Sequence, residues 1–395
     1  MQLPPARGVA IRRHDAGLPA PSLPAAALMP PASPRPPKAW VTAWLPSRAG
    51  VLQFCETVGV GAAGGGLFLW AQLPGGLISG AMIAVAAAAT VMRRPLGLPP
   101  VVAHAILMTL GVSLGSMVSP QMLRNIASYP VSIAVLAVST FGATYGSSKY
   151  LQRVHGWDRA SAFLAGSPGA LSQIIMLATE RNADVAGIAV VQTMRVIILT
   201  AALPLVLSLI GFAPHAGLSL RAPPATPQAL AVLAAASLAA SYVLHRLKFP
   251  ASWMFGAMLA SSVLHGAGLV EGGLPLWAYM VALAGIGILI GSRFARISGA
   301  TVLRHILAAL GSFAVAIAIS AVFVALVATV TGERLSDVIV AFAPGAMDAM
   351  LALALTLHID PVFVGAHHLS RFIYVTIATP GIMHLFGRDD EEIDD

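Results

Sequence analysis

Two arginines lie inside apolar stretches of the sequence, where a charged side chain is expensive. Arg195 stands in VVQTMRVIILT and Arg371 stands in HHLSRFIYVTI. A charged side chain at the centre of a membrane helix costs about 2.5–3.5 kcal/mol on insertion scales, so it needs a partner or an aqueous cavity. Two arginines together can clamp a carboxylate, a phosphate or another anion. Alternatively, each arginine ties down backbone carbonyls that a nearby break in a helix has freed.

Two Pro-Gly pairs offer a second kind of chemistry. Pro168-Gly169 interrupts the apolar run 160–179, and Pro344-Gly345 interrupts the run 336–357. A helix broken at such a pair exposes N–H and C=O groups that can bind an ion or a polar substrate. We therefore expect the substrate-binding residues at the two arginines and the two breaks, namely Arg195, Arg371, Ser167, Pro168, Gly169, Ser172, Gln173, Pro344, Gly345 and Asp348.

The composition indicates that these residues belong to a membrane protein. Of the 395 residues, 57% are hydrophobic and only 10% are charged, whereas a soluble domain carries about 25% charged residues. The single cysteine, Cys55, excludes an internal disulfide and a cysteine-based metal site. The net charge of +7 is typical of basic cytoplasmic loops. We expect the lipid bilayer and a small solute or ion as partners, no nucleic acid, and leave a homo-oligomer open.

Ten apolar runs are long enough to cross a bilayer, which takes about 20 residues of helix. In chain order they are 49–71, 75–92, 99–117, 129–148, 184–212, 226–244, 250–270, 274–292, 305–330 and 361–386. The two membrane domains are therefore predicted at 49–212 and 226–386. Residues 1–48 hold 11 of the 28 prolines, which predicts a disordered tail, and residues 387–395 form an acidic tail.

The two membrane domains are copies of one another at an offset of 176 residues. Gly80-Ala81-Met82 matches Gly256-Ala257-Met258, and both Pro-Gly-Ala triplets and both buried arginines fall in the same register. Apolar composition alone would not align Pro, Gly, Asp and Arg identities in one fixed register. The sequence therefore predicts an internal duplication, which is common in secondary transporters.

Loop charges distinguish two arrangements of these halves. If all twelve apolar runs span the membrane, the halves are parallel, and the basic loop residues divide into seven inside and seven outside. If the two Pro-Gly runs re-enter the same side, the halves are inverted, and the division becomes 11 inside and three outside. The positive-inside rule favours the second arrangement. We predict an all-α polytopic membrane protein with about ten transmembrane helices, two re-entrant Pro-Gly hairpins and two inverted repeats. The alternative is 12 spanning helices in two parallel repeats.

Three acidic residues have assignable roles. Asp348 occupies the position equivalent to Ser172 in the first half, where it either binds a cation or a proton or neutralises Arg371. Asp184 and Asp360 begin the last span of each repeat. Aspartate favours the N-cap position because its side chain accepts a hydrogen bond from the first turn, so we expect both to be helix caps.

Four histidines gather in and around the last apolar run; they are His358, His367, His368 and His384. Adjacent histidines project from different faces of a helix, and no Asp or Glu set stands at ligand spacing beside them. We therefore expect them to pack or to line a polar cavity, and we expect no metal site and no cofactor.

The halves share a paired motif that resembles a known family. The first half reads SAFLAGSPGALSQ followed by ADVAGIAVVQTMR, and the second reads VIVAFAPGAMDA followed by IDPVFVGAHHLSR. These motifs resemble the AbrB-type membrane proteins, whose domain is duplicated in the same way. The resemblance covers both repeats and leaves out both tails. It implies one of three activities, because members are labelled as ammonia monooxygenases, as regulators of gene expression or as transporters.

Among these activities the residues favour transport. No copper or iron ligand set supports a monooxygenase, so we expect no enzyme, and no helix-turn-helix supports direct DNA binding. We expect a multi-pass protein of the bacterial inner membrane that moves a small solute, such as an organic anion, by alternating access. The alternative is a membrane protein that regulates gene expression indirectly, without direct DNA binding.

Overall fold

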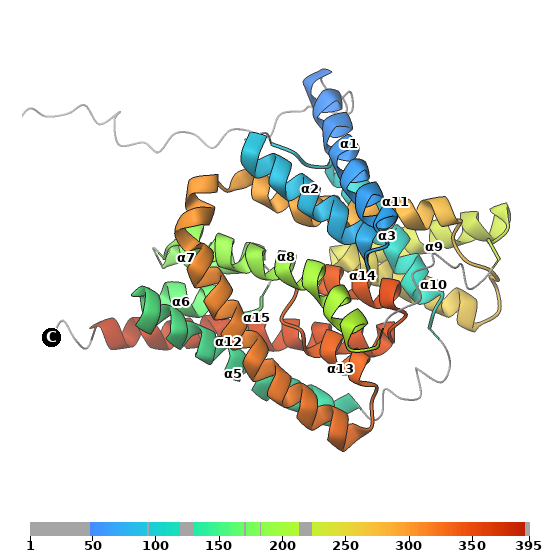
Figure 1. The fold of residues 1–395 in the computed structure, drawn as a ribbon. Helices are drawn as coiled ribbons and strands as arrows, with labels where there is room; N and C mark the ends of the chain where they lie inside the picture. The colour runs from blue at the N-terminus through green and yellow to red at the C-terminus, as the bar shows by residue number, and fades with distance from the viewer. Residues whose placement is uncertain are drawn as a thin grey trace, which may run out of the picture. The chain divides into compact units, whose positions relative to one another are not determined.

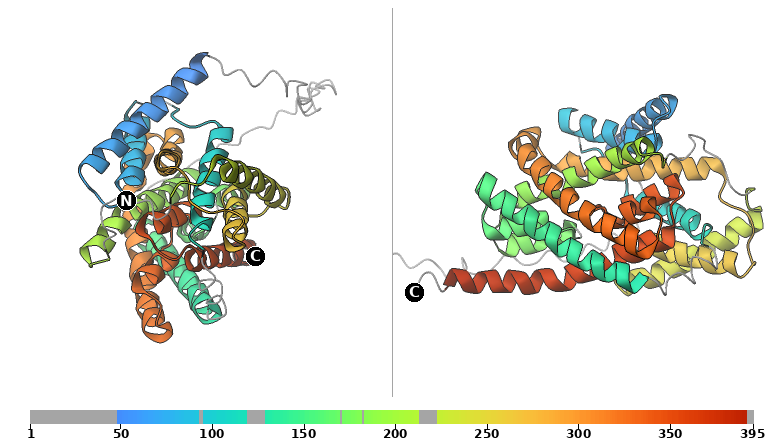
Figure 2. Two further views of the ribbon diagram at one scale, coloured as in Figure 1. Left: turned by 90° about the vertical axis from the view of Figure 1, so that its right-hand side faces the viewer. Right: turned by 60° about the horizontal axis from the view of Figure 1, so that its bottom comes forward.

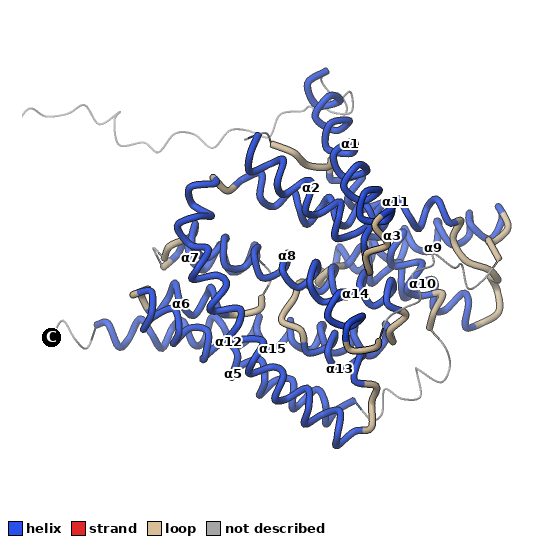
Figure 3. The backbone as a smooth tube through the Cα atoms, viewed as in Figure 1, coloured by secondary structure: helices blue, strands red, loops and turns tan. Residues whose placement is uncertain are grey.

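The computed structural model describes residues 48–92, 95–118, 129–169, 171–181, 183–212 and 223–391. Within these ranges the regular elements are helices, accompanied by an isolated β-bridge between Pro224 and Gly273 (Figures 1 and 3). The prediction of an all-α protein is confirmed. The disordered tail predicted for residues 1–48 lies, up to Ser47, outside the described residues.

Ten helices correspond to the ten apolar runs. They are α1 (Arg48–Trp70), α2 (Gly76–Met92), α3 (Pro100–Gly115), α5 (Tyr129–His155), α8 (Val185–Leu209), α9 (Pro227–Arg246), α10 (Ser252–Gly266), α11 (Leu276–Gly291), α12 (Gly299–Thr331) and α15 (Pro361–Glu391). A short 3-10 helix, η3 (Ser292–Arg296), follows α11. The last helix continues beyond residue 386 into the segment predicted as an acidic tail.

Six of the described helices are long and apolar enough to cross a membrane, namely α1, α5, α8, α9, α11 and α12. This confirms a polytopic membrane protein. Helices α2 and α3 are apolar but have only 17 and 16 residues. At 1.5 Å per residue they cover about 25 Å, less than the ~30 Å of a hydrocarbon core. The number of ten crossings therefore stays a prediction.

Each Pro-Gly run is broken into two short helices. The first run forms α6 (Arg159–Gly166) and α7 (Leu171–Glu180), and the second forms α13 (Leu335–Phe342) and α14 (Met347–Leu357). Proline has no N–H to donate and clashes with the preceding turn, so a helix cannot continue through it unchanged. The two pairs are called hairpin 1 (α6 and α7) and hairpin 2 (α13 and α14) below.

The aspartates predicted as caps do cap helices. Asp184 Oδ1 accepts a hydrogen bond of 3.0 Å from the backbone N–H of Gly187 at the start of α8. Asp360 Oδ1 accepts from the N–H groups of Val362 and Phe363 at the start of α15. Each bond satisfies an orphan donor in the first helical turn, and a negative charge there also complements the helix dipole.

Two close helix contacts repeat at the 176-residue offset. In α3, a Cβ built on Gly111 would lie 2.2 Å from the carbonyl oxygen of Met254 in α10. In α11, a Cβ built on Gly287 would lie 2.4 Å from the carbonyl oxygen of Ile78 in α2. Gly287 is equivalent to Gly111, and Ile78 is equivalent to Met254. Exchanging the two halves therefore converts the α3–α10 contact into the α11–α2 contact, as a pseudo-two-fold axis requires.

The direction of α5 and α12 shows that the halves are inverted. These two helices occupy equivalent positions in the repeats and lie side by side (Figures 1 and 2). Ser147 Oγ donates to the carbonyl of Ser312 at 2.9 Å, and Tyr150 packs against Gly311, while Gly142 faces Ile319 further along. Along the contact, residue numbers increase in α5 while they decrease in α12. These two repeat-equivalent helices therefore run antiparallel. A two-fold axis produces this only if it lies across the helices, and the predicted inversion is confirmed.

The helices pack as two sets, each drawn from both halves. One set contains α1–α3 with α9–α11, and the other contains α5–α8 with α12–α15. Helices α8 and α14 contact both sets and lie between them in Figure 1. The main apolar core runs through hairpin 2, where Leu351, Leu353 and Phe342 are at most 1% exposed. The site described next lies where the two hairpins meet α8 and α15.

Candidate functional site

Hairpin 1 enters and leaves at the same end of α8. At the start of α6, Ser161 Oγ accepts a hydrogen bond of 2.8 Å from the N–H of Asp184, which precedes α8. At the other end of α6 and halfway along α8, Arg195 Nη1 donates to the carbonyl of Gly166 at 3.2 Å. Eleven residues of α8 between these contacts span about 16 Å, roughly half of a hydrocarbon core. The Pro-Gly break therefore lies beside the middle of α8, as a re-entrant hairpin requires.

Hairpin 2 has the same relation to α15. His368 Nε2 contacts the carbonyl of Val340 at 3.0 Å, and one turn on, Arg371 Nη1 donates to the carbonyl of Ala343 at 2.7 Å. Arg371 Nη2 donates to the carbonyl of Gly345 at 3.2 Å, on the far side of the break. Both tips are thus held by a repeat-equivalent arginine about eleven residues into the following long helix.

Arg195 is held by a compact polar network. Its Nη2 donates to the carbonyl of Ser167 at 3.4 Å and to the side-chain oxygen of Gln192. Gln192 Nε2 also donates to the carbonyls of Leu164 and Ser167. These carbonyls have lost their helical partners at the break, and a guanidinium offers five donors in a fixed fork that suits such a cluster. The geometry supports the view that the arginines hold freed carbonyls.

In hairpin 2 a histidine replaces that glutamine. His368 is equivalent to Gln192, and its Nδ1 hydrogen bonds to Arg371 Nη2. His367 is turned away, with Nε2 at 2.8 Å from Ser132 Oγ and Nδ1 at 2.7 Å from the carbonyl of Phe363. The two adjacent histidines therefore project from different faces of α15, as predicted. Among the described residues no three His, Cys, Asp or Glu side chains gather so as to hold a metal ion.

Both arginines are buried, and no carboxylate of the described residues pairs with either. Arg195 is 6% exposed and Arg371 is 3% exposed. In the part of the chain that the structure describes, neither arginine forms a salt bridge with an aspartate or glutamate. Two uncompensated cations in a low-dielectric region strongly favour a negative charge between or beside them.

The tip of hairpin 1 reaches the helix that carries Arg371. A Cβ built on Gly169 would lie 3.3 Å from the side chain of Val375, one turn after Arg371. Gln173 Oε1 accepts a hydrogen bond of 3.2 Å from Thr376 Oγ1. The structure therefore brings the predicted residues of the first tip next to α15. The side chain of Ser172 lies outside the described residues.

Asp348 does not neutralise Arg371. Its Oδ2 lies 3.4 Å from Arg293 Nη2, on η3, and both side chains are about a quarter exposed. Of the two roles expected for Asp348, the pairing with Arg371 is wrong, because Arg371 is held at the tip by carbonyls while Asp348 lies in the first turn of α14 and pairs with η3. Binding of a cation or a proton by Asp348 stays a prediction. An acid in a first helical turn is also favoured by the helix dipole.

The structure adds supporting residues that the sequence did not assign to the tips. Gln192, which was not singled out, and His368, which was expected only to pack or to line a cavity, hydrogen bond to the arginines from three residues earlier on the same helix face. That spacing was the signal that could have identified them. Asp337, 3% exposed, accepts from Arg334 Nη2 at 2.9 Å at the mouth of hairpin 2. Nearby, burial and then the charges of Asp337 and Asp360 raise the pKa of Glu333.

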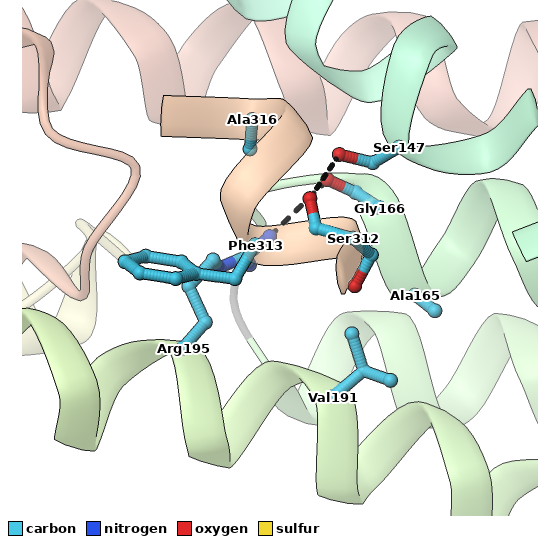
Figure 4. Close-up of a pocket in the computed structure, with 8 residues that line it drawn as sticks. All are labelled: Ser147, Ala165, Gly166, Val191, Arg195, Ser312, Phe313 and Ala316. Atoms are coloured by element: carbon cyan, nitrogen blue, oxygen red, sulfur yellow. Dashed lines mark hydrogen bonds between the residues drawn. The ribbon is translucent and has the colours of Figure 1, made fainter. Parts of the chain in front are cut away.

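A narrow crevice opens beside Arg195. It is lined by Ser147, Ala165, Gly166, Val191, Arg195, Ser312, Phe313 and Ala316 (Figure 4). Its empty space is about 190 Å³, but it is spread too thinly to admit a water molecule in this conformation. Within the described residues, Arg195 Nε has no hydrogen-bond partner. The crevice thus borders a buried donor that is still free.

Comparison with known proteins agrees with this architecture. Residues 77–387 match a family model described as "Transition state regulatory protein AbrB". The uncharacterized protein YhjN of Bacillus subtilis (strain 168) is 28% identical over 298 residues, which cover 70% of this chain and 77% of that protein. No solved structure gives a significant match.

Proposed function

The chain belongs to the AbrB family, and we propose that it is a secondary transporter that moves a small organic anion across a bacterial inner membrane by alternating access. The observation that carries the proposal is the pair of buried, repeat-equivalent arginines at the tips of two inverted hairpins. Neither has a carboxylate partner among the described residues. Under this proposal the partners are the bilayer and the solute, and no enzymatic step is assigned.

The inverted repeat supports this mechanism. Two halves related by an axis across the helices can exchange conformations, so that a site between them faces each side of the membrane in turn. Broken helices near mid-depth provide polar backbone groups where the hydrocarbon would otherwise exclude them. Both features meet here at Arg195 and Arg371.

The positive charge of the site supports an anion as the transported solute. A bound carboxylate would compensate the buried positive charge of the guanidinium groups. The residues predicted to bind substrate at the first tip, Ser167, Pro168, Gly169, Ser172 and Gln173, and those at the second, Pro344 and Gly345, would contribute backbone and side-chain contacts. Asp348 is less suited to this role, because it is paired with Arg293.

Flux through proteoliposomes tests the proposal. The purified chain is reconstituted, and uptake of labelled monocarboxylates, dicarboxylates and an uncharged amide is measured. Arg195→Ala and Arg371→Ala should each abolish anion uptake, whereas Arg246→Ala, at the exposed end of α9, should leave it unchanged. Unaltered transport in both tip variants would sink the substrate role of the arginines. Absence of any anion flux in folded wild-type protein would sink the transporter.

A second candidate is a membrane protein that regulates gene expression indirectly. The description of the matching family model, which names a regulatory protein, favours it. A reporter-gene comparison separates the two functions in cells that carry either the wild type or the Arg371→Ala variant. A response that persists when flux is lost would favour regulation without transport.

A further inference from the structure

The crevice beside Arg195 has a distinctive chemistry. Arg195 is 94% buried, its Nη1 and Nη2 atoms donate to carbonyl and amide oxygens, and its Nε–H points to no acceptor in the described residues. A buried donor without a partner costs about 1–3 kcal/mol. The same residue lines the narrow crevice, which does not admit a water molecule in this conformation. A buried cationic donor without a partner among the described residues, beside a crevice, suits the binding of a negatively charged hydrogen-bond acceptor.

The other polar groups of the crevice do not compete for that acceptor. Ser147 Oγ already donates to the carbonyl of Ser312 at 2.9 Å, and Ser312 Oγ donates to the carbonyl of Ala309 at 3.1 Å. The remaining lining is apolar, from Ala165, Val191, Phe313 and Ala316. A ligand therefore meets one cationic donor in an otherwise apolar pocket, which suits a single carboxylate on a short hydrocarbon chain.

In the second half, larger side chains fill the position equivalent to the crevice. Gly166 corresponds to Phe342, Val191 to His367 and Ser312 to Leu136. These larger side chains are at most 1% exposed and belong to, or contact, the main apolar core. The crevice is thus a property of the first half, and the arginine of the second half is enclosed by packing.

We propose that the crevice between α5, α6, α8 and α12 binds the carboxylate of a small monocarboxylate, with Arg195 Nε as its donor and the hydrocarbon chain against Val191, Phe313 and Ala316. This inference rests on the proposed function and narrows its substrate class. Phe313 is the largest lining side chain and is only partly buried. A change of its rotamer is the smallest movement that would widen the crevice.

Binding to the purified full-length chain tests the assignment. Sodium propionate and sodium butyrate are titrated by isothermal calorimetry, with propionamide as the uncharged probe, and sodium chloride and sodium phosphate as inorganic anions. The carboxylates should bind, and propionamide and the inorganic anions should bind at least about tenfold more weakly, because the amide lacks the charge and the inorganic ions lack an apolar chain.

Variants locate the binding. Ser312→Leu places in the crevice the residue that the second half has there, and it should weaken propionate binding by about tenfold or more. Ser320→Leu, on the same helix and also buried, lies outside the crevice and should bind as the wild type does. Arg195→Lys keeps a positive charge but lacks the Nε–H, and should also weaken binding. If Ser312→Leu does not fold, Ala316→Leu fills the same space one turn later.

The outcomes distinguish this inference from the transporter proposal. Equal propionate affinity in the wild type and the filled variants would overturn the inference, as would equal affinity for propionamide. If those results came with continued flux of another anion, the transporter would stand. Selective propionate binding without any flux would support the crevice and reject transport.

Discussion

Hairpin 1 and hairpin 2 descend from the same sequence pattern but have different surroundings. In both, an arginine eleven residues into the following helix donates to carbonyls at the Pro-Gly break. Hairpin 2 is enclosed by the main core, and most of α14 is fully buried. In hairpin 1, Met176 of α7 is 55% exposed, and the smaller lining leaves a crevice beside Arg195.

The duplicated halves therefore agree in one structural role and differ in another. The contacts that keep the broken helices in place are the same in both halves, whereas the residues around them differ. Glutamine supports the arginine in the first half and histidine in the second, and Gly166 stands where the second half has Phe342. We infer that the second half supplies rigid packing and the first half supplies adaptable space for a ligand.

The largest expected effect comes from removing the arginine of the enclosed hairpin. Arg371→Ala leaves the carbonyls of Ala343 and Gly345 unpaired, and each buried acceptor without a partner costs about 1–3 kcal/mol. Arg195→Ala should destabilise less, because Gln192 still donates to the carbonyls of Leu164 and Ser167 at that tip. Thermal midpoints of both variants in detergent check this order, and a larger loss in Arg195→Ala would contradict the comparison.

The glycine contacts between helices should respond equally in the two halves. Gly111→Ala and Gly287→Ala each bring a methyl group within 2.4 Å of a carbonyl oxygen. Such overpacking typically costs about 1–3 kcal/mol, and the cost should be similar for both because the contacts are symmetric. Gly66→Ala is the matched control, since nothing lies within 4 Å of its added Cβ. Thermal midpoints that drop in only one of the two variants would argue against the pseudo-two-fold packing.

Breaking the Asp348–Arg293 pair should have a small effect. Both side chains are about a quarter exposed, and ion pairs near the surface contribute about 0–1 kcal/mol. Asp348→Asn should therefore lower the free energy of unfolding only slightly and leave anion flux intact. Arg293→Gln should have the same small effect. A loss in Asp348→Asn as large as that in Arg371→Ala would instead indicate that Asp348 serves the tip.

The smallest expected effect is a pH dependence found only at the mouth of hairpin 2. The pKa of Glu333 is raised by burial and by Asp337 and Asp360, whereas the equivalent residue in the first half, Trp157, cannot titrate. The folded state therefore holds this proton more tightly than the unfolded state does. The stability it contributes is fully present below the unfolded pKa of about 4.3 and is lost as the pH rises through the folded pKa.

Thermal midpoints measured from about pH 4 to pH 7 should show this loss in the wild type and a flatter profile in Glu333→Gln. Trp157→Phe, at the equivalent site, should keep the wild-type profile. If Glu333→Gln and the wild type followed the same curve, the raised pKa would have no role in stability.

Much of the architecture could be predicted from the sequence because it depends on local rules. Apolar runs predict helices, Pro-Gly pairs predict breaks, and the register of Gly80 with Gly256 predicts the duplication. Loop charges even predicted the inversion, which the antiparallel α5 and α12 confirm. These features need no knowledge of which side chains meet.

The environment of the site could not be predicted in the same way. The partner of Asp348 depends on the rotation of α14 relative to η3, which a sequence register does not specify. The crevice depends on three small residues from different helices, Ser147, Gly166 and Ser312, coming together. Only tertiary packing decides such contacts. The assignment of residues 1–48 as a disordered tail stays a prediction.

The central claim is that the two halves are inverted copies whose hairpins open to opposite sides of the membrane. Single cysteines at Arg181→Cys and Arg334→Cys, in a chain with Cys55→Ser, mark the mouths of hairpin 1 and hairpin 2. Labelling with a membrane-impermeant maleimide is compared in intact and permeabilised cells. In the inverted arrangement the basic loop residues place Arg181 inside and Arg334 outside. The cysteine at position 334 should therefore react in intact cells and the one at position 181 only after permeabilisation. Labelling of both from the same side would contradict it.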